Sequence, residues 1–233
     1  MCLTAAVAAG WASLASRASQ ASHTAQHRNA APERSTGTHA VKALRVVVMG
    51  VSGCGKSALA KRLARAVGGE FVEGDELHSV RNVELMAAGI ALTDDDRQGW
   101  LQTIADRLRQ AQQQERSIVV SCSALKRRYR DLLRQGAADT RFIHLHGSAK
   151  VLAQRLARRA GHYMPASLLP SQLQALEAPG PDENALTFDI ETPLETVVKA
   201  ALKGLTTTTV ATVATSTTLT TLATPTASTD AST

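Results

Sequence analysis

The fold of this chain is decided by one stretch, Gly50-Val51-Ser52-Gly53-Cys54-Gly55-Lys56-Ser57, which matches the phosphate-loop pattern G-x-x-x-x-G-K-[ST] at every position. The apolar run 44–49 precedes it and suits a buried parallel strand, and the helical pattern 58–67 follows it. The loop therefore leads into a helix N-terminus, where unpaired N–H groups and the helix dipole favour an anion. We predict that it binds a nucleoside triphosphate. The alternative is a glycine-rich turn without a ligand, which would not need every position to match.

Each position of the loop has an expected role. The glycines let the main chain wrap around phosphate oxygens. Lys56 is expected to reach the β- and γ-phosphates of ATP, and the Ser57 hydroxyl to hold Mg²⁺. The candidate nucleotide-binding residues are Gly50, Val51, Ser52, Gly53, Cys54, Gly55, Lys56 and Ser57. Cys54 stands beside Lys56 near a helix N-terminus, which favours a reactive thiolate unless the side chain turns under the loop.

The two ends of the chain differ in composition from its middle. The chain has 233 residues and 44% apolar content, enough for one sizeable domain. Residues 1–43 are basic and rich in Ala, Ser and Thr, and residues 205–233 are rich in Thr. We expect both ends to be disordered, the first being either a targeting-like extension or an unselected one. The folded domain is predicted to span residues 44–204.

Composition also excludes several classes of function. The net charge of +6 is modest, aromatic content is 3%, and no basic run is interleaved with aromatic residues, which disfavours a nucleic-acid-binding surface. The three cysteines form no C-x-x-C motif and indicate a reducing compartment. No segment approaches the length of a membrane span. We predict a cytoplasmic protein, or an organellar one if the N-terminal extension is a transit peptide.

Strand and helix patterns alternate along the predicted domain. The expected strands are 44–49, 70–73, 117–122, 141–145 and 186–190. The expected helices are 58–67, 76–89, 93–114, 123–135, 149–159 and a last one with Pro193 in its first turn. This alternation predicts an α/β fold with a doubly wound, five-stranded parallel sheet of the P-loop type. Ligands of such sheets bind at the carboxyl ends of the strands.

Residues that follow the second predicted strand are candidates for the active site. Asp75 could accept the proton of an attacking hydroxyl or hold Mg²⁺ through water, the alternative being an N-cap for the next helix. His78, Arg81 and Asn82 follow within a turn and could line a polyol pocket, although each alone would more often be surface decoration.

The end of the third predicted strand lacks an Asp, which argues against a motor ATPase or a GTPase. Lys126 and Arg130 follow it with i,i+4 spacing, so they face one direction and could clamp a carboxylate. The alternative is a solvated basic helix face.

Arg155 and Arg159 repeat that spacing after the fourth strand. Their guanidinium groups could stabilise charge on a transferring phosphate, so the candidate catalytic residues are Lys56, Asp75, Arg155 and Arg159. The segment 161–172 suits a water-excluding lid, and its His162 and Gln172 are further candidate substrate-binding residues.

Five blocks of this sequence, in matching order and spacing between about residues 45 and 203, resemble bacterial-type gluconokinases. The blocks are 48–57, 73–82, 92–101, 122–131 and 155–162. The resemblance implies a shikimate-kinase-like nucleoside-kinase fold, ATP with Mg²⁺, phosphorylation of D-gluconate at O6, and a homodimer. The sequence departs from the family at Cys54, commonly Ser, at Ser79, often Pro, and at Leu173, often Phe.

Without the family resemblance, the residues themselves indicate only a small-molecule kinase. A kinase for another hydroxy acid such as shikimate, or a nucleotide-binding switch without turnover, therefore remains as an alternative. The presence of Asp75, Arg155 and Arg159 argues against the switch, because binding alone would not need them.

Overall fold

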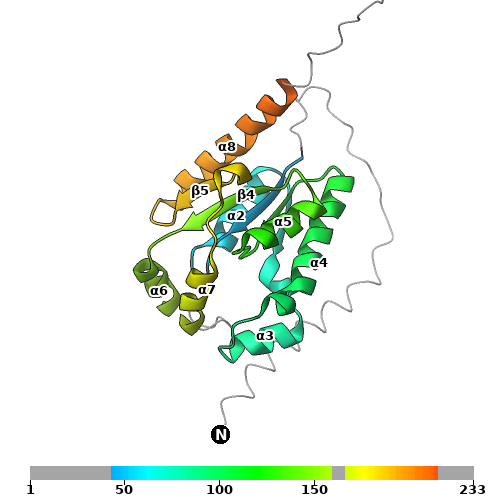
Figure 1. The fold of residues 1–233 in the computed structure, drawn as a ribbon. Coiled ribbons are helices and arrows are strands. Elements are labelled where there is room, and N and C mark those ends of the chain that lie inside the picture. Colours follow the sequence, from blue (N-terminus) through cyan, green and yellow to red (C-terminus); the bar gives the residue numbers. More distant parts are fainter. Residues whose placement is uncertain (1–42, 159–165, 215–233) are drawn as a thin grey trace, which may run out of the picture. The chain divides into compact units, whose positions relative to one another are not determined.

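The computed structural model describes residues 43–158 and 166–214, which lie within one compact unit (Figure 1). Its elements are, in chain order, β1 (Arg45–Met49), α2 (Lys56–Ala66), β2 (Glu70–Glu73), η1 (Gly74–Leu77), α3 (Val80–Ala87), α4 (Asp94–Gln113), β3 (Ile118–Ser121), α5 (Arg127–Gly136), β4 (Arg141–His146), α6 (Ala149–Ala157), η2 (Ala166–Leu168), α7 (Leu169–Ala175), η3 (Pro181–Glu183), β5 (Leu186–Asp189) and α8 (Leu194–Ala214).

The five strands form one sheet in the order β2-β3-β1-β4-β5, and every neighbouring pair is parallel. All five residues of β1 are buried, because helices cover both faces of the sheet. The predicted doubly wound parallel sheet is confirmed. The chain crosses over β1 between β3 and β4, so the loop after β1 opens at the switch point where such folds bind ligands.

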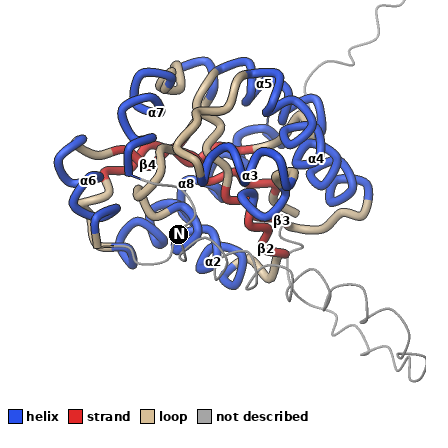
Figure 2. The backbone as a smooth tube through the Cα atoms, turned by 90° about the horizontal axis from the view of Figure 1, so that it is seen from below, coloured by secondary structure: helices blue, strands red, loops and turns tan. Residues whose placement is uncertain are grey.

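Alternate residues of β1 supply two separate cores. One core packs the sheet against α2 and α8, and the other packs it against α4 and α5 (Figures 1 and 2). The first includes Val46, Val48, Leu59, Leu63 and Ala201. The second includes Val47, Met49, Ile104, Leu108 and Leu133. The result is a three-layered domain with β1 at its centre.

Helix α4 begins where the sequence predicts. Thr93 caps it: the Asp96 amide donates to Thr93 Oγ1 at 3.2 Å, and the Thr93 amide donates to the Asp96 carboxylate at 2.9 Å. Its predicted inward stripe is buried, and it includes Trp100, Leu101 and Ile104. The cap therefore fixes the first turn of α4, which faces the candidate site.

The C-terminal limit of the folded domain differs from the prediction. Helix α8 continues to Ala214, and Leu205 is buried in the first core. The hydroxyls of Thr206 and Thr207 donate to carbonyl oxygens of the preceding turn, so these threonines are accommodated within the helix. The predicted boundary at residue 204 therefore falls inside a helix and is wrong.

Other predicted segments need smaller corrections. Helix α5 begins at Arg127 rather than at residue 123, Pro193 precedes α8 rather than lying in it, and the irregular stretch 160–177 contains α7. No helix among residues 43–158 and 166–214 is long and apolar enough to cross a membrane. The predictions for residues 1–42 and 215–233 concern segments outside the described residues.

Candidate active site

The phosphate-loop pattern forms a tight turn from β1 into α2. Gly50 has φ of 136°, and a Cβ there would lie 2.4 Å from the Leu145 carbonyl oxygen. Gly55, with φ of 95°, is the N-cap of α2. Side chains at these positions would be strained, so glycine lets the backbone keep the curvature that surrounds a phosphate.

Lys56 and Asp75 line the same cleft at the carboxyl ends of the central strands, together with Ser52. Lys56 stands in the first turn of α2, and its Nζ donates to the Val51 carbonyl oxygen at 3.1 Å. Asp75 reaches the cleft from η1, which directly follows β2. The structure thus brings a cation of the loop and a carboxylate to one cavity, as the two motifs predict.

His78 and Trp100 form one wall of the cleft. Their rings stack with centroids 4.1 Å apart, and Trp100 Nε1 donates to the Gly74 carbonyl oxygen at 2.7 Å. Burial, with a smaller effect of the nearby Arg97 charge, lowers the pKa of His78 to about 4. The imidazole is therefore neutral at pH 7. Its Nδ1 is buried and has no hydrogen-bond partner among the described residues.

Gln172 closes the cleft from α7. Its Oε1 accepts a hydrogen bond from the Ser52 amide of the phosphate loop at 2.7 Å. This contact joins residues 120 positions apart and places α7 against the loop. The predicted lid segment thus reaches the loop through Gln172. Arg159 and His162 lie outside the described residues.

Arg81 and Asn82 do not line the cleft, contrary to the expectation for a polyol pocket. Arg81 is 77% exposed and pairs with the Asp96 carboxylate at 3.4 Å. Asn82 is buried, and its Nδ2 donates to the Asp96 carbonyl oxygen at 2.6 Å. Asn82 therefore ties α3 to α4, and neither side chain faces the cleft.

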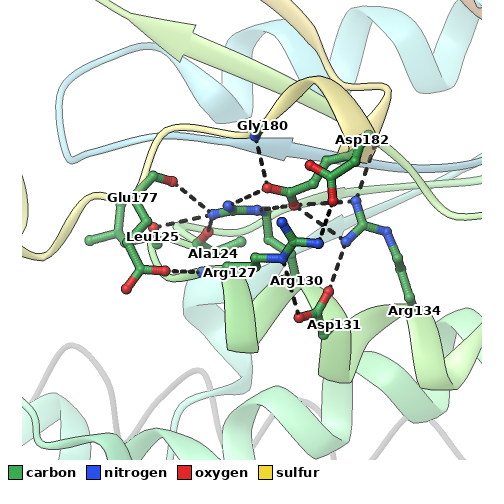
Figure 3. Close-up of polar contacts among 10 residues, drawn as sticks. Ala124, Leu125, Arg127, Arg130, Asp131, Arg134, Glu177, Gly180 and Asp182 are labelled. Atoms are coloured by element: carbon green, nitrogen blue, oxygen red, sulfur yellow. Dashed lines mark hydrogen bonds and ion pairs between the residues drawn. The ribbon is translucent and has the colours of Figure 1, made fainter.

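Arg130 is not available to a substrate, which corrects its prediction as a carboxylate clamp. It is buried on α5, and its guanidinium donates to both carboxylate oxygens of Glu183, at 2.6 and 2.7 Å. Nη1 also donates to the carbonyl oxygens of Ala124, Leu125 and Glu177 (Figure 3). The guanidinium therefore holds the segment before β5 onto α5.

Lys126 points elsewhere, so it does not form a clamp with Arg130. It occupies the N-cap position of α5, and its Nζ donates to the Asp94 carboxylate at 2.9 Å. The i,i+4 rule fails for this pair because Lys126 precedes the helix and has an extended backbone.

Cys54 is shielded rather than reactive. It is 2% exposed, and burial raises the pKa of its thiol. Its Sγ lies beneath the loop, 2.9 Å from where a Cβ on Gly50 would stand. The second alternative for this side chain is therefore the correct one, and the expected thiolate is wrong.

Arg155 lies at a second cavity on the other side of the loop. Gly55, Ala58, Leu145 and the chain after β5 line this cavity. Arg155 Nη2 donates to the Ile190 carbonyl oxygen at 2.7 Å. It is not among the residues that line the cleft of Asp75, and its role in stabilising a transferring phosphate stays a prediction. Sequence reasoning missed this cavity because backbone and apolar side chains line much of it.

Arg97, Trp100 and Ser123 also line the cleft, and sequence reasoning gave none of them a site role. Arg97 and Trp100 are three residues apart at the start of α4, so they share a helix face. That spacing, next to the capping box of α4, is the sequence feature that could have indicated their place in the site.

A phosphate loop at the centre of a parallel sheet, with a carboxylate across a cleft, defines the class of P-loop small-molecule kinases. A family model described as an AAA domain matches residues 46–179.

Similar proteins of known name identify the family more narrowly. The thermoresistant gluconokinase of Escherichia coli K12 is 44% identical over 158 residues, which cover 67% of this chain and 90% of that enzyme. The gluconokinase of Gluconobacter oxydans is 47% identical, covering 68% and 89% of the two chains. The crystal structure of a gluconokinase from Sinorhizobium meliloti 1021 superposes with a TM-score of 0.68 at 45% identity, covering 75% and 98%. This chain belongs to the gluconokinase family.

Proposed function

We propose that this protein transfers the γ-phosphate of ATP to D-gluconate, forming 6-phospho-D-gluconate. The observation that carries the proposal is the cleft shared by Lys56 and Asp75, in a chain 44–47% identical to two gluconokinases. Lys56 neutralises charge on the phosphates, and Asp75 orients the attacking hydroxyl or accepts its proton. His78 and Gln172 contact the polyol or the loop beside it.

The nucleotide is proposed to span the loop. The amides of residues 50–57 bind its phosphates, and the cavity beside Ile190 accepts the base, with Arg155 at its edge. Mg²⁺ fits the donor set, because the Ser57 hydroxyl and the Asp75 carboxylate are oxygen ligands and this ion completes its shell with water and phosphate oxygens. Bound there, it would neutralise charge on the phosphates.

A coupled ADP-release assay tests the proposal. D-Gluconate, shikimate and other sugar acids are compared at saturating MgATP, with Lys56→Met as the inactive control. We expect turnover with gluconate, and none with a Lys56→Met variant that melts at the parent's temperature. ATP binding without turnover on any acid would favour a nucleotide switch. Preference for another acid would move the protein to a neighbouring kinase specificity.

We further propose a cytoplasmic homodimer, as the family resemblance implies. Light scattering after size-exclusion chromatography should give twice the chain mass of 24.6 kDa. A mass of one chain at micromolar concentration would contradict the dimer without bearing on the activity.

A further inference from the structure

In the structure, the two cations predicted to bind a substrate carboxylate have other partners. Arg130 is buried against Glu183, and Lys126 pairs with Asp94. Arg81 is exposed and pairs with Asp96. A sugar acid in the cleft therefore needs another positive partner for its carboxylate.

Two cations that line the cleft, Lys56 and Arg97, form no ion pair within the described residues, and Lys56 is assigned to the phosphates in the proposed function, which leaves Arg97. It stands in the first turn of α4, half-buried, and its Nη1 donates to the carbonyl oxygens of Leu92 and Thr93. Within residues 43–158 and 166–214, no carboxylate forms an ion pair with it. Its remaining N–H groups can therefore donate to a ligand's oxygens in the bidentate geometry that guanidinium groups favour.

The surroundings of Arg97 suit a carboxylate with a hydroxyl next to it. His78 is stacked on Trp100, one turn further along α4, and its buried Nδ1 has no partner in the described part of the chain. A neutral imidazole offers that nitrogen to a hydroxyl group. Asp75 lines the same cleft and repels a carboxylate, so the charged end of a sugar acid is directed away from it.

We propose that Arg97 is the specificity-determining residue that binds the substrate carboxylate, with His78 Nδ1 binding the adjacent hydroxyl. The proposal rests on the proposed function, gluconate phosphorylation. It orients the substrate with its carboxylate toward α4 and its terminal hydroxyl toward Asp75 and the phosphate loop.

The test compares kcat and KM of the parent with those of Arg97→Gln and Arg97→Lys. Loss of a charge-assisted bond should raise the gluconate KM about tenfold to a hundredfold while the ATP KM stays within about twofold. Arg97→Lys should recover part of the affinity, because it keeps the charge. The control is Arg109→Gln, three turns along the same helix and 42% exposed, which should match the parent.

Three results separate the possibilities. A folded Arg97→Gln with the parent's gluconate KM overturns the proposal. Equal rises in both KM values with a lower melting temperature, and no recovery in Arg97→Lys, overturn it in favour of a purely structural role for the bonds to Leu92 and Thr93. Absence of gluconate turnover in the parent itself overturns the proposed function instead.

Discussion

Replacing Glu183 by Gln should destabilise the domain without changing substrate affinity. Glu183 is 8% exposed and accepts two hydrogen bonds from Arg130, which is fully buried. Arg134 adds a longer contact at 3.3 Å. Gln keeps the volume of the side chain but removes its charge, and it turns an amide donor toward a guanidinium donor. The Arg130 charge is then buried without a counter-charge.

Two independent estimates of the loss in unfolding free energy agree. Breaking a buried ion pair by neutralising one partner costs about 3–5 kcal/mol. The hydrogen bonds from Arg130, as the largest effect, lower the pKa of Glu183 from 4.5 to about 2. That difference corresponds to about 3 kcal/mol at 1.36 kcal/mol per pH unit. For a domain of this size each kcal/mol shifts Tm by about 2–4 °C, so we expect a fall of roughly 6–20 °C.

The dependence on pH gives a second signature. The folded-state pKa of Glu183 lies below its ordinary value, so its stabilisation is present above pH 4.5 and is lost as pH falls toward 2. The parent should lose about 3 kcal/mol of unfolding free energy to this group over that window. The Glu183→Gln variant lacks the group, so the difference between the two proteins should shrink there.

Urea unfolding followed by circular dichroism measures these quantities, with Asp182→Asn as the control. Asp182 directly precedes Glu183 in the chain but is 58% exposed, and it pairs with the exposed Arg127, so its loss should cost about 0–1 kcal/mol. A Glu183→Gln protein with the parent's stability but a raised gluconate KM would refute the reasoning. Arg130 would then have to reach the substrate.

Three further results are expected. Cys54 should resist thiol reagents in the native protein and react only in urea, and Cys54→Ser should stay active; rapid native labelling at this position would contradict its burial. A chain ending at Gly204 should be about 2 kcal/mol less stable than one ending at Ala214, because it loses the burial of Leu205; equal urea midpoints would contradict this. Gly136→Ala should lower Tm despite its better helix propensity, since the new Cβ would lie 2.2 Å from a backbone oxygen of α4; a rise in Tm would show that the two helices can separate.

The parts of this structure that follow from local rules could be predicted from the sequence. The strands are buried apolar runs, and the phosphate loop needs glycine at positions where any side chain would be strained. Thr93 and Asp96 make a capping box from residues only three apart. Such features depend on residues close together in the chain, so they can be predicted from the local sequence alone.

Features that depend on partners distant in sequence could not be predicted. Arg130 has a spacing that suits a clamp, but its counter-charge lies 53 residues later. Helix α5 starts late because the Glu177 carboxylate accepts the Arg127 amide at 2.6 Å from 50 residues away. Periodicity tells which side chains share a helix face, but not which residues lie opposite that face. The same limit explains why Arg97 was not among the predicted substrate-binding residues, although it lines the cleft.

The hydrogen bond between Gln172 and Ser52 uses an amide of the phosphate loop that the proposed function assigns to the nucleotide. A phosphate oxygen that takes the Ser52 amide has to displace Gln172 Oε1, which is 2.7 Å away. A hydrogen bond of this kind is worth about 0.5–1.5 kcal/mol, so in the proposed complex this internal competitor would weaken the apparent nucleotide affinity about twofold to tenfold. Because Gln172 stands on α7, which also lines the cleft of Asp75, its displacement would link occupancy of the proposed nucleotide and gluconate subsites.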